Sequence, residues 1–246
     1  DKVEQNRKEC YIREFSIEHF HDSKVFETLI PKICKIFREE NEELTGFENE
    51  EILAEYQIYK TPGYVYMKGN VQIYSAGKQA ADISAFPEGI AVAVGSEEDV
   101  PDICPDQTID KVFTIENLTS FYRFKQEHSL VIYLGGYHNH SRRNLLMQIY
   151  QKLPDAQYYH FGDLDAGGFY ILEHLKRKTG IPFQMFQMDI ETLKKYEDYA
   201  KPLTENDKKR LMQLEKMELP DEERKLITYM LQKGIKLEQE CISESQ

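Results

Sequence analysis

Three acidic side chains in this sequence could hold a divalent metal ion. Glu116 directly follows an apolar stretch at 112–115, and Asp163 and Asp165 follow another at 157–161. In an extended segment residues i and i+2 point to the same side, so the two aspartates can face one ion. Three carboxylates within about 5 Å of one another repel by roughly 3 kcal/mol per pair at an effective dielectric of about 20. We expect Mg²⁺ (or Mn²⁺) as the cofactor, because these ions prefer oxygen ligands and would offset the repulsion.

An isolated Asp-x-Asp is more often a turn with a helix cap, so the prediction depends on the sheet that presents the whole set. Strand-like apolar stretches alternate with helix-like stretches in this part of the chain. Because the strands are apolar on both faces, the alternation favours an α/β fold, a parallel sheet covered by helices. Right-handed crossovers would bring the carboxyl ends of the strands to one edge, where such folds bind ligands. The strand-like stretches are 112–115, 129–134, 157–161 and 181–188.

Other acidic residues could join this edge. Asp189 follows the fourth strand-like stretch and either joins the metal site or caps the next helix, the second being the simpler role. Glu238 and Glu240 lie far along the chain and would have to fold back to reach the metal. We therefore keep Asp189 and Glu240 as secondary metal candidates.

The first 108 residues have a different pattern. A helical periodicity runs over 23–44 and is interrupted by Pro31, which predicts a kink or two short helices. Three strand-like runs follow, and the turn residues between them predict an antiparallel meander. We expect an N-terminal α+β region at 1–108, with a winged-helix-like arrangement as one option, and a parallel-sheet domain with a helical tail at 109–246. The three runs are 55–60, 64–68 and 71–74.

The composition limits the class of protein. The chain has 31 Lys and Arg against 43 Asp and Glu, and its net charge of −12 argues against a generally basic nucleic-acid coat. No apolar run approaches the ~20 residues that a membrane span needs. The four cysteines are scattered without zinc-site spacing, which favours reduced thiols in a cytoplasm. Because the sequence starts at Asp1 without a Met or a signal-peptide pattern, we expect a piece of a longer protein.

The acidic motifs resemble the Toprim signature, in which a Glu follows one strand and Asp-x-Asp a later one. The run from Gly162 to Gly168 is similar to the Asp-x-Asp-Pro-x-Gly version in type IIB topoisomerases, with Ala166 where those enzymes often have Pro. The sequence resembles still more closely the JetD family, the nuclease subunits of the Wadjet plasmid-defence system. This resemblance is dense over 111–241 and thin before residue 100. It includes Glu14-Phe15-Ser16, Asp22-Ser23-Lys24, Ile115-Glu116-Asn117, Met188-Asp189, Thr192-Leu193 and Leu237-Glu238-Gln239-Glu240.

The resemblance implies a Toprim fold for 109–246, a divalent metal and cleavage of double-stranded DNA in a bacterial cytoplasm. It also implies SMC-like ATPase partners, with a homodimer as an option. We expect phosphodiester hydrolysis in which Asp163 and Asp165 hold metal, while Glu116 holds a second ion or acts as general base. The alternatives are a non-catalytic DNA-binding or assembly module, and a topoisomerase-like transesterase. The second would need a Tyr outside this sequence, because Tyr11 lacks the Tyr doublet of that family.

DNA must be bound despite the negative net charge, and the stretch after the second strand is the best candidate. It contains His138, His140, Arg142 and Arg143. The arginines would lie at a helix N-terminus, where amides and side chains can share a phosphate. The alternatives are ordinary surface charge for the arginines and a zinc site for the histidines, which no nearby Cys supports. Lys24 begins a predicted helix and is a further candidate for DNA or for a neighbouring domain.

Overall fold

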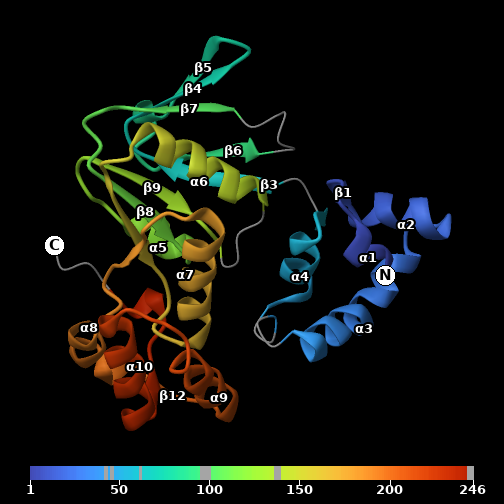
Figure 1. Cartoon of the computed structure of the whole chain (residues 1–246). Coiled ribbons are helices and arrows are strands. Elements are labelled where there is room, and N and C mark those ends of the chain that lie inside the picture. The colour runs from blue at the N-terminus through green and yellow to red at the C-terminus, as the bar shows by residue number, and fades with distance from the viewer. Residues whose placement is uncertain (42–43, 45–46, 61–62, 95–100, 136–139, 243–246) are drawn as a thin grey trace.

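The computed structural model describes residues 1–41, 44, 47–60, 63–94, 101–135 and 140–242, which contain a six-stranded sheet (Figure 1). The order of its strands is β11 (Gln184–Met185), β10 (Gln157–Phe161), β8 (Lys111–Ile115), β9 (Ser129–Tyr133), β3 (Gly63–Lys68) and β6 (Ile90–Val94). The first four strands are parallel, whereas β3 is antiparallel to both β9 and β6. The predicted fold class, α/β with a mostly parallel sheet flanked by helices, is confirmed.

The sheet is buried on both faces because its central strands are apolar almost throughout. Along β8, Val112 packs in one hydrophobic core and Phe113 in the other, as the alternation of a strand requires. The first core includes side chains of α6 (His140–Lys152) and α7 (Ala166–Thr179). The second includes side chains of α5 (Leu118–Arg123), α8 (Ile190–Lys195), α9 (Glu205–Leu214) and α10 (Asp221–Lys233). Helices on both faces therefore hold the strand ends at fixed positions.

The chain begins with a group of helices, blue in Figure 1. They are α1 (Lys2–Gln5), α2 (Ile12–Phe20), α3 (Val25–Glu40) and α4 (Asn49–Glu55), with β1 (Cys10–Tyr11) parallel to β2 (Ile58–Tyr59). Pro31 lies inside α3, which continues past it as one helix. The buried residues of these helices belong to the first core, so the group packs with the sheet domain.

The predicted antiparallel meander is wrong in its pairing. Strand β2 pairs with β1, β3 pairs with β6 and β9, and β4 (Val71–Ser75) pairs with β5 (Lys78–Asp82) and β7 (Asp102–Pro105). The turn after β3 explains the divergence. At Gly69, with φ of 138°, an added Cβ would lie 2.5 Å from the carbonyl oxygen of Ser129. The turn thus packs closely against the start of β9, and the next strand, β4, belongs to a separate three-stranded sheet.

The expected boundary at residue 108 falls between β7 and β8, and the six-stranded sheet crosses it. Strands β3 and β6 come before that boundary, yet they extend the sheet beyond β9. The first core also contains residues from both sides, such as Phe26 and Leu172. The two parts of the chain therefore share a sheet and a core.

The helix boundaries of the second half follow the local signals. Gly180 and Gly234, both with φ of 70°, end α7 and α10. Thr204 and Asp207 form a capping box at the start of α9, and Pro220 precedes α10. The remaining elements are β12 (Lys201–Pro202), its antiparallel partner β13 (Ile235–Lys236), and 3₁₀ turns at Ile83–Ala85, Glu197–Tyr199 and Gln239–Cys241.

The structure also bears on the cysteines and on membrane spans. Cys34 is buried, the other three cysteines are half-buried, and all four are free thiols. Among the helices of the described segments, none has the length and apolar character that crossing a bilayer would require.

Candidate functional site

Glu116 and Asp163 meet where β8 and β10 end. The backbone N–H of Glu116 donates to the Phe161 carbonyl at 3.0 Å, which continues the pairing of the two strands by one residue. The backbone N–H of Asp163 lies 3.4 Å from Glu116 Oε2 and donates to it. The strand ends thus bring together two of the three predicted carboxylates across 47 residues of sequence.

Two glycines, Gly162 and Gly168, allow the surrounding backbone to pack closely against the acidic residues. A Cβ on Gly168 would lie 2.2 Å from the carbonyl oxygen of Asp163, so the first turn of α7 packs directly on the acidic loop. A Cβ on Gly162 would lie 2.7 Å from Glu116 Oε2. Any other residue at either position would displace backbone or a site carboxylate, so the Gly-rich run is required by packing.

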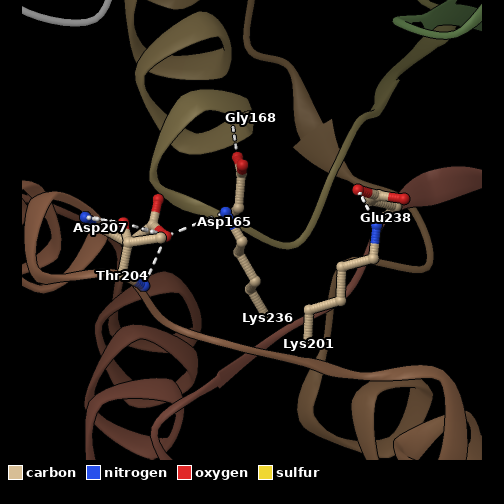
Figure 2. Close-up of polar contacts among 7 residues, drawn as sticks. All are labelled: Asp165, Gly168, Lys201, Thr204, Asp207, Lys236 and Glu238. Carbon is tan, nitrogen blue, oxygen red and sulfur yellow. Dashed lines mark hydrogen bonds and ion pairs between the residues drawn. The ribbon is translucent and has the colours of Figure 1, made fainter.

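Asp165 lies at the N-cap of α7. Its Oδ1 accepts a hydrogen bond from the Gly168 N–H at 2.9 Å, and Figure 2 shows this carboxylate directed along the start of the helix. Two ion pairs lie in the same view, Lys236 of β13 with Asp207 of α9 at 2.9 Å and Lys201 of β12 with Glu238 at 2.5 Å. The capping alternative for Asp-x-Asp is therefore realised by Asp165, while the backbone of Asp163 contacts Glu116.

A distant segment closes the site from the other side. Leu237 forms a β-bridge with Leu164, which places the following turn over the acidic loop. The N–H of Gln239 donates to Asp163 Oδ1 at 2.6 Å. Its fully buried side chain donates to the Phe161 carbonyl at 3.0 Å and accepts from the Asn117 N–H at 2.8 Å. Gln239 thus links the ends of β8 and β10 to the candidate metal ligand Asp163 through hydrogen bonds.

The sequence analysis assigned no role to Gln239. A single glutamine 76 residues after Asp163 carries no local pattern, and only its place in the segment Leu237 to Glu240 of the family resemblance marked it. Glu240, from the same turn, accepts from Asn117 Nδ2 at 2.5 Å. The fold-back that would bring Glu240 near the site is therefore observed.

The acidic residues raise one another's pKa. Burial, followed by the charges of Asp163 and Asp165, raises the pKa of Glu116 from 4.5 to about 8. Burial, with the charges of Asp165 and Glu240, raises the pKa of Asp163 from 3.8 to about 6, although the Gln239 hydrogen bond acts to lower it. The carboxylates are thus costly to ionise together, which is the electrostatic property expected of a site completed by a cation.

The donor set fits a hard divalent cation. Glu116, Asp163 and Asp165 offer only oxygen atoms, and Mg²⁺ usually takes one or two carboxylates together with water and substrate phosphates. Within the described ranges, no three or more His, Cys, Asp or Glu side chains are already arranged to hold a metal. Binding of a metal ion by these residues therefore stays a prediction.

Asp189 has the role of a helix cap. Its Oδ1 accepts from the Thr192 N–H at 2.6 Å at the start of α8. This is the simpler of the two roles that the sequence allowed. Membership of Asp189 in a metal site has no support from this contact.

The predicted DNA-binding residues lie in several environments. Arg142 donates to the Leu134 carbonyl at 2.7 Å and to that of Tyr64 at 3.3 Å. Arg143 forms an ion pair with Glu55 at 2.8 Å, with 10% of its side chain exposed. Both guanidinium groups thus make contacts inside the protein, and a role for them in DNA binding stays a prediction.

The remaining DNA candidates are Lys24, His140 and His138. Lys24 is exposed at the start of α3, and His140 is the first residue of α6. His138 lies outside the described residues. Contacts of these three residues with DNA stay predictions.

Comparison with known proteins gives two matches. Residues 98–246 match the family model described as the C-terminal region of Wadjet protein JetD. A Wadjet protein JetD of Bacillus cereus strain Q1 is 30% identical over 235 residues. That alignment covers 94% of this chain and 56% of the relative, so the chain spans little more than half of the length of that relative.

Proposed function

This chain belongs to the JetD family of Wadjet proteins, and from that premise we propose that it is a DNA endonuclease of the Wadjet plasmid-defence system. The reaction is hydrolysis of a phosphodiester bond that depends on Mg²⁺ or Mn²⁺. The observation that carries the proposal is the meeting of Glu116 and Asp163 at the ends of two adjacent parallel strands, with Asp165 two residues on. Their raised pKa values indicate that ionising these carboxylates together is costly, a cost that a bound cation would offset.

Each residue has a distinct part in this mechanism. Asp163 and Asp165 hold the metal, which when bound supplies positive charge to the phosphate oxygens. Glu116 either holds a second ion or removes a proton from the attacking water at its carboxylate. A base works best when its pKa is close to the working pH, and the raised pKa of Glu116, about 8, meets that condition. Gln239 keeps the Asp163 carboxylate in place through its backbone N–H.

The test uses supercoiled plasmid with Mg²⁺ or Mn²⁺, with and without a chelator. Asp163→Asn removes the charge but keeps an oxygen that can accept from Gln239, so the fold should survive while cleavage is lost. Asp155→Asn is the matched control, because Asp155 is exposed just before β10, at the opposite end of that strand. Unchanged cleavage by folded Asp163→Asn protein would refute the proposal.

The same assay separates the alternative functions. Binding of plasmid without cleavage in any metal indicates a DNA-binding or assembly module. A protein-linked DNA end indicates a topoisomerase-like transesterase. We also propose SMC-like ATPase partners that deliver DNA and a homodimer that cuts both strands. Because the isolated chain lacks these partners, the assay is accompanied by calorimetric titration of the chain alone with Mn²⁺. Loss of Mn²⁺ binding in Asp163→Asn is expected whether or not the isolated chain cuts DNA.

A further inference from the structure

Four positions on one face of the sheet surround the acidic site. Thr114 lies opposite His160 in the pairing of β8 with β10, and Glu116 and Gly162 follow each of them by two residues. Because side chains two apart on a strand share a face, all four positions point to the same side of the sheet. The face thus presents a hydroxyl, an imidazole, a carboxylate and one position without a side chain.

The imidazole of His160 is fully buried, and only one of its two ring nitrogens has a hydrogen-bond partner among the described residues. Its Nδ1 lies 3.0 Å from Thr114 Oγ1, and that hydroxyl also donates to the Tyr159 carbonyl at 3.2 Å. Its Nε2 has no hydrogen-bond partner within the part of the chain that the structure describes. A buried polar atom without a partner destabilises the fold, so its retention calls for a role.

The space at Gly162 shows where this nitrogen is directed. A Cβ at residue 162 would lie 2.8 Å from His160 Nε2 and 2.7 Å from Glu116 Oε2. The two atoms therefore border the same small space, which exists because residue 162 is a glycine. Any larger residue would separate the imidazole from the carboxylate.

We propose that His160 is a positioning residue that fixes the Glu116 carboxylate through one water across the space over Gly162. The Thr114 hydroxyl can rotate between the Tyr159 carbonyl and Nδ1, so either imidazole tautomer is available. Nε2 can then accept from this water or donate to it, as the protonation state of Glu116 requires. This inference rests on the proposed function, since it assigns a support to the carboxylate of that site. Supports of this kind around metal ligands typically affect metal affinity or activity by 10–100-fold.

Two substitutions separate this role from a purely structural one. His160→Asn keeps a polar group near Nδ1, so it can retain the Thr114 contact, but it has nothing at Nε2. His160→Gln places its amide nitrogen near Nε2. If the only role of His160 were its hydrogen bond with Thr114, the Asn variant would bind Mn²⁺ as tightly as wild type.

The readouts are Mn²⁺ affinity by calorimetry and the thermal midpoint of each protein. We expect His160→Asn to lose roughly tenfold or more in Mn²⁺ affinity, and His160→Gln to stay within about threefold of wild type. Equal affinities for the Asn variant and wild type, or equal losses in both variants, overturn the inference while leaving the proposed function intact. A wild-type protein that binds no Mn²⁺ overturns both.

A measurement on the wild-type protein covers the case in which a variant does not fold. The ring ¹⁵N shifts of His160 are followed by NMR during titration with Mg²⁺. We expect them to move on metal binding, because the charge of the neighbouring carboxylate changes. Shifts that stay constant while Mg²⁺ binds overturn the inference.

Discussion

Glu116→Gln should make the metal-free protein more stable while it removes the proposed nuclease activity. The pKa of Glu116 is raised from 4.5 to about 8, so between these values the folded protein keeps a proton that the unfolded chain has released. Stability then falls as pH rises, by about 1.4 kcal/mol per pH unit. Gln imitates the protonated side chain and can still accept from the Asp163 N–H, so it avoids this cost.

The size of the effect follows from the distance between pH 7 and 4.5. Over this interval the cost of Glu116 accumulates to about 3 kcal/mol, an upper figure because the residue as a whole is only half-buried. For a chain of this length about 1 kcal/mol changes the midpoint of thermal unfolding by roughly 2–4 °C. Glu116→Gln should therefore raise the midpoint by up to roughly 10 °C at pH 7, and the gain should vanish towards pH 4.5.

The assay is thermal unfolding of both proteins from pH 4.5 to 8 in chelator, repeated with excess Mg²⁺. Wild type should gain stability from the metal, by about 2.7 kcal/mol at 100 times its dissociation constant, and the variant should gain less. Glu127→Gln is the control, because Glu127 is exposed and its replacement should change stability by no more than about 0.5 kcal/mol. A less stable Glu116→Gln protein at pH 7, or a difference that does not depend on pH, would refute the electrostatic reasoning.

Two other substitutions test contacts around the site. Glu55→Ala should destabilise the protein by about 3–5 kcal/mol in urea unfolding, because it removes the carboxylate that pairs with the buried guanidinium of Arg143; a loss below about 1 kcal/mol would contradict this. Burial alone would raise the pKa of Glu55, but its hydrogen bond with His174 and the charge of Arg143 hold this pKa well below the usual value. The contribution of Glu55 to the stability of the wild-type protein is therefore present above pH 4.5 and disappears as the pH falls below that value. Gln239→Leu should cost about 1–3 kcal/mol for the Asn117 N–H that it leaves unpaired, while the Phe161 carbonyl keeps the Glu116 N–H, and it should weaken Mn²⁺ binding; unchanged values in both calorimetry and thermal unfolding would contradict this.

The strands that carry the site could be predicted because their signals are local. The apolar stretch before Glu116 and the one before Asp163 coincide with β8 and β10, and right-handed crossovers suffice to place their ends together. The capping roles of Asp189 and Thr204 could be read in the same way, since a cap depends on residues within one turn.

Contacts between distant segments could not be predicted from the sequence. The return of Gln239 to Asp163 and the addition of β3 to the sheet depend on partners far away in the chain. Arg143 illustrates the difficulty: a basic residue near the start of a helix has the same local pattern whether it faces a phosphate or, as here, Glu55. The tertiary partner decides which role such a residue has, and residue spacing along the sequence gives no information about that partner.

The crossing of the sheet over the expected domain boundary has a practical consequence for dissection of the protein. A fragment starting at residue 109, or at residue 98 where the family match begins, would lack β3 and leave the side of β9 without its partner. An uncovered strand of this kind recruits other chains and promotes aggregation. The region that the family model matches is thus shorter than the region that shares the sheet. Truncated versions intended for biochemistry should retain residues 63–94.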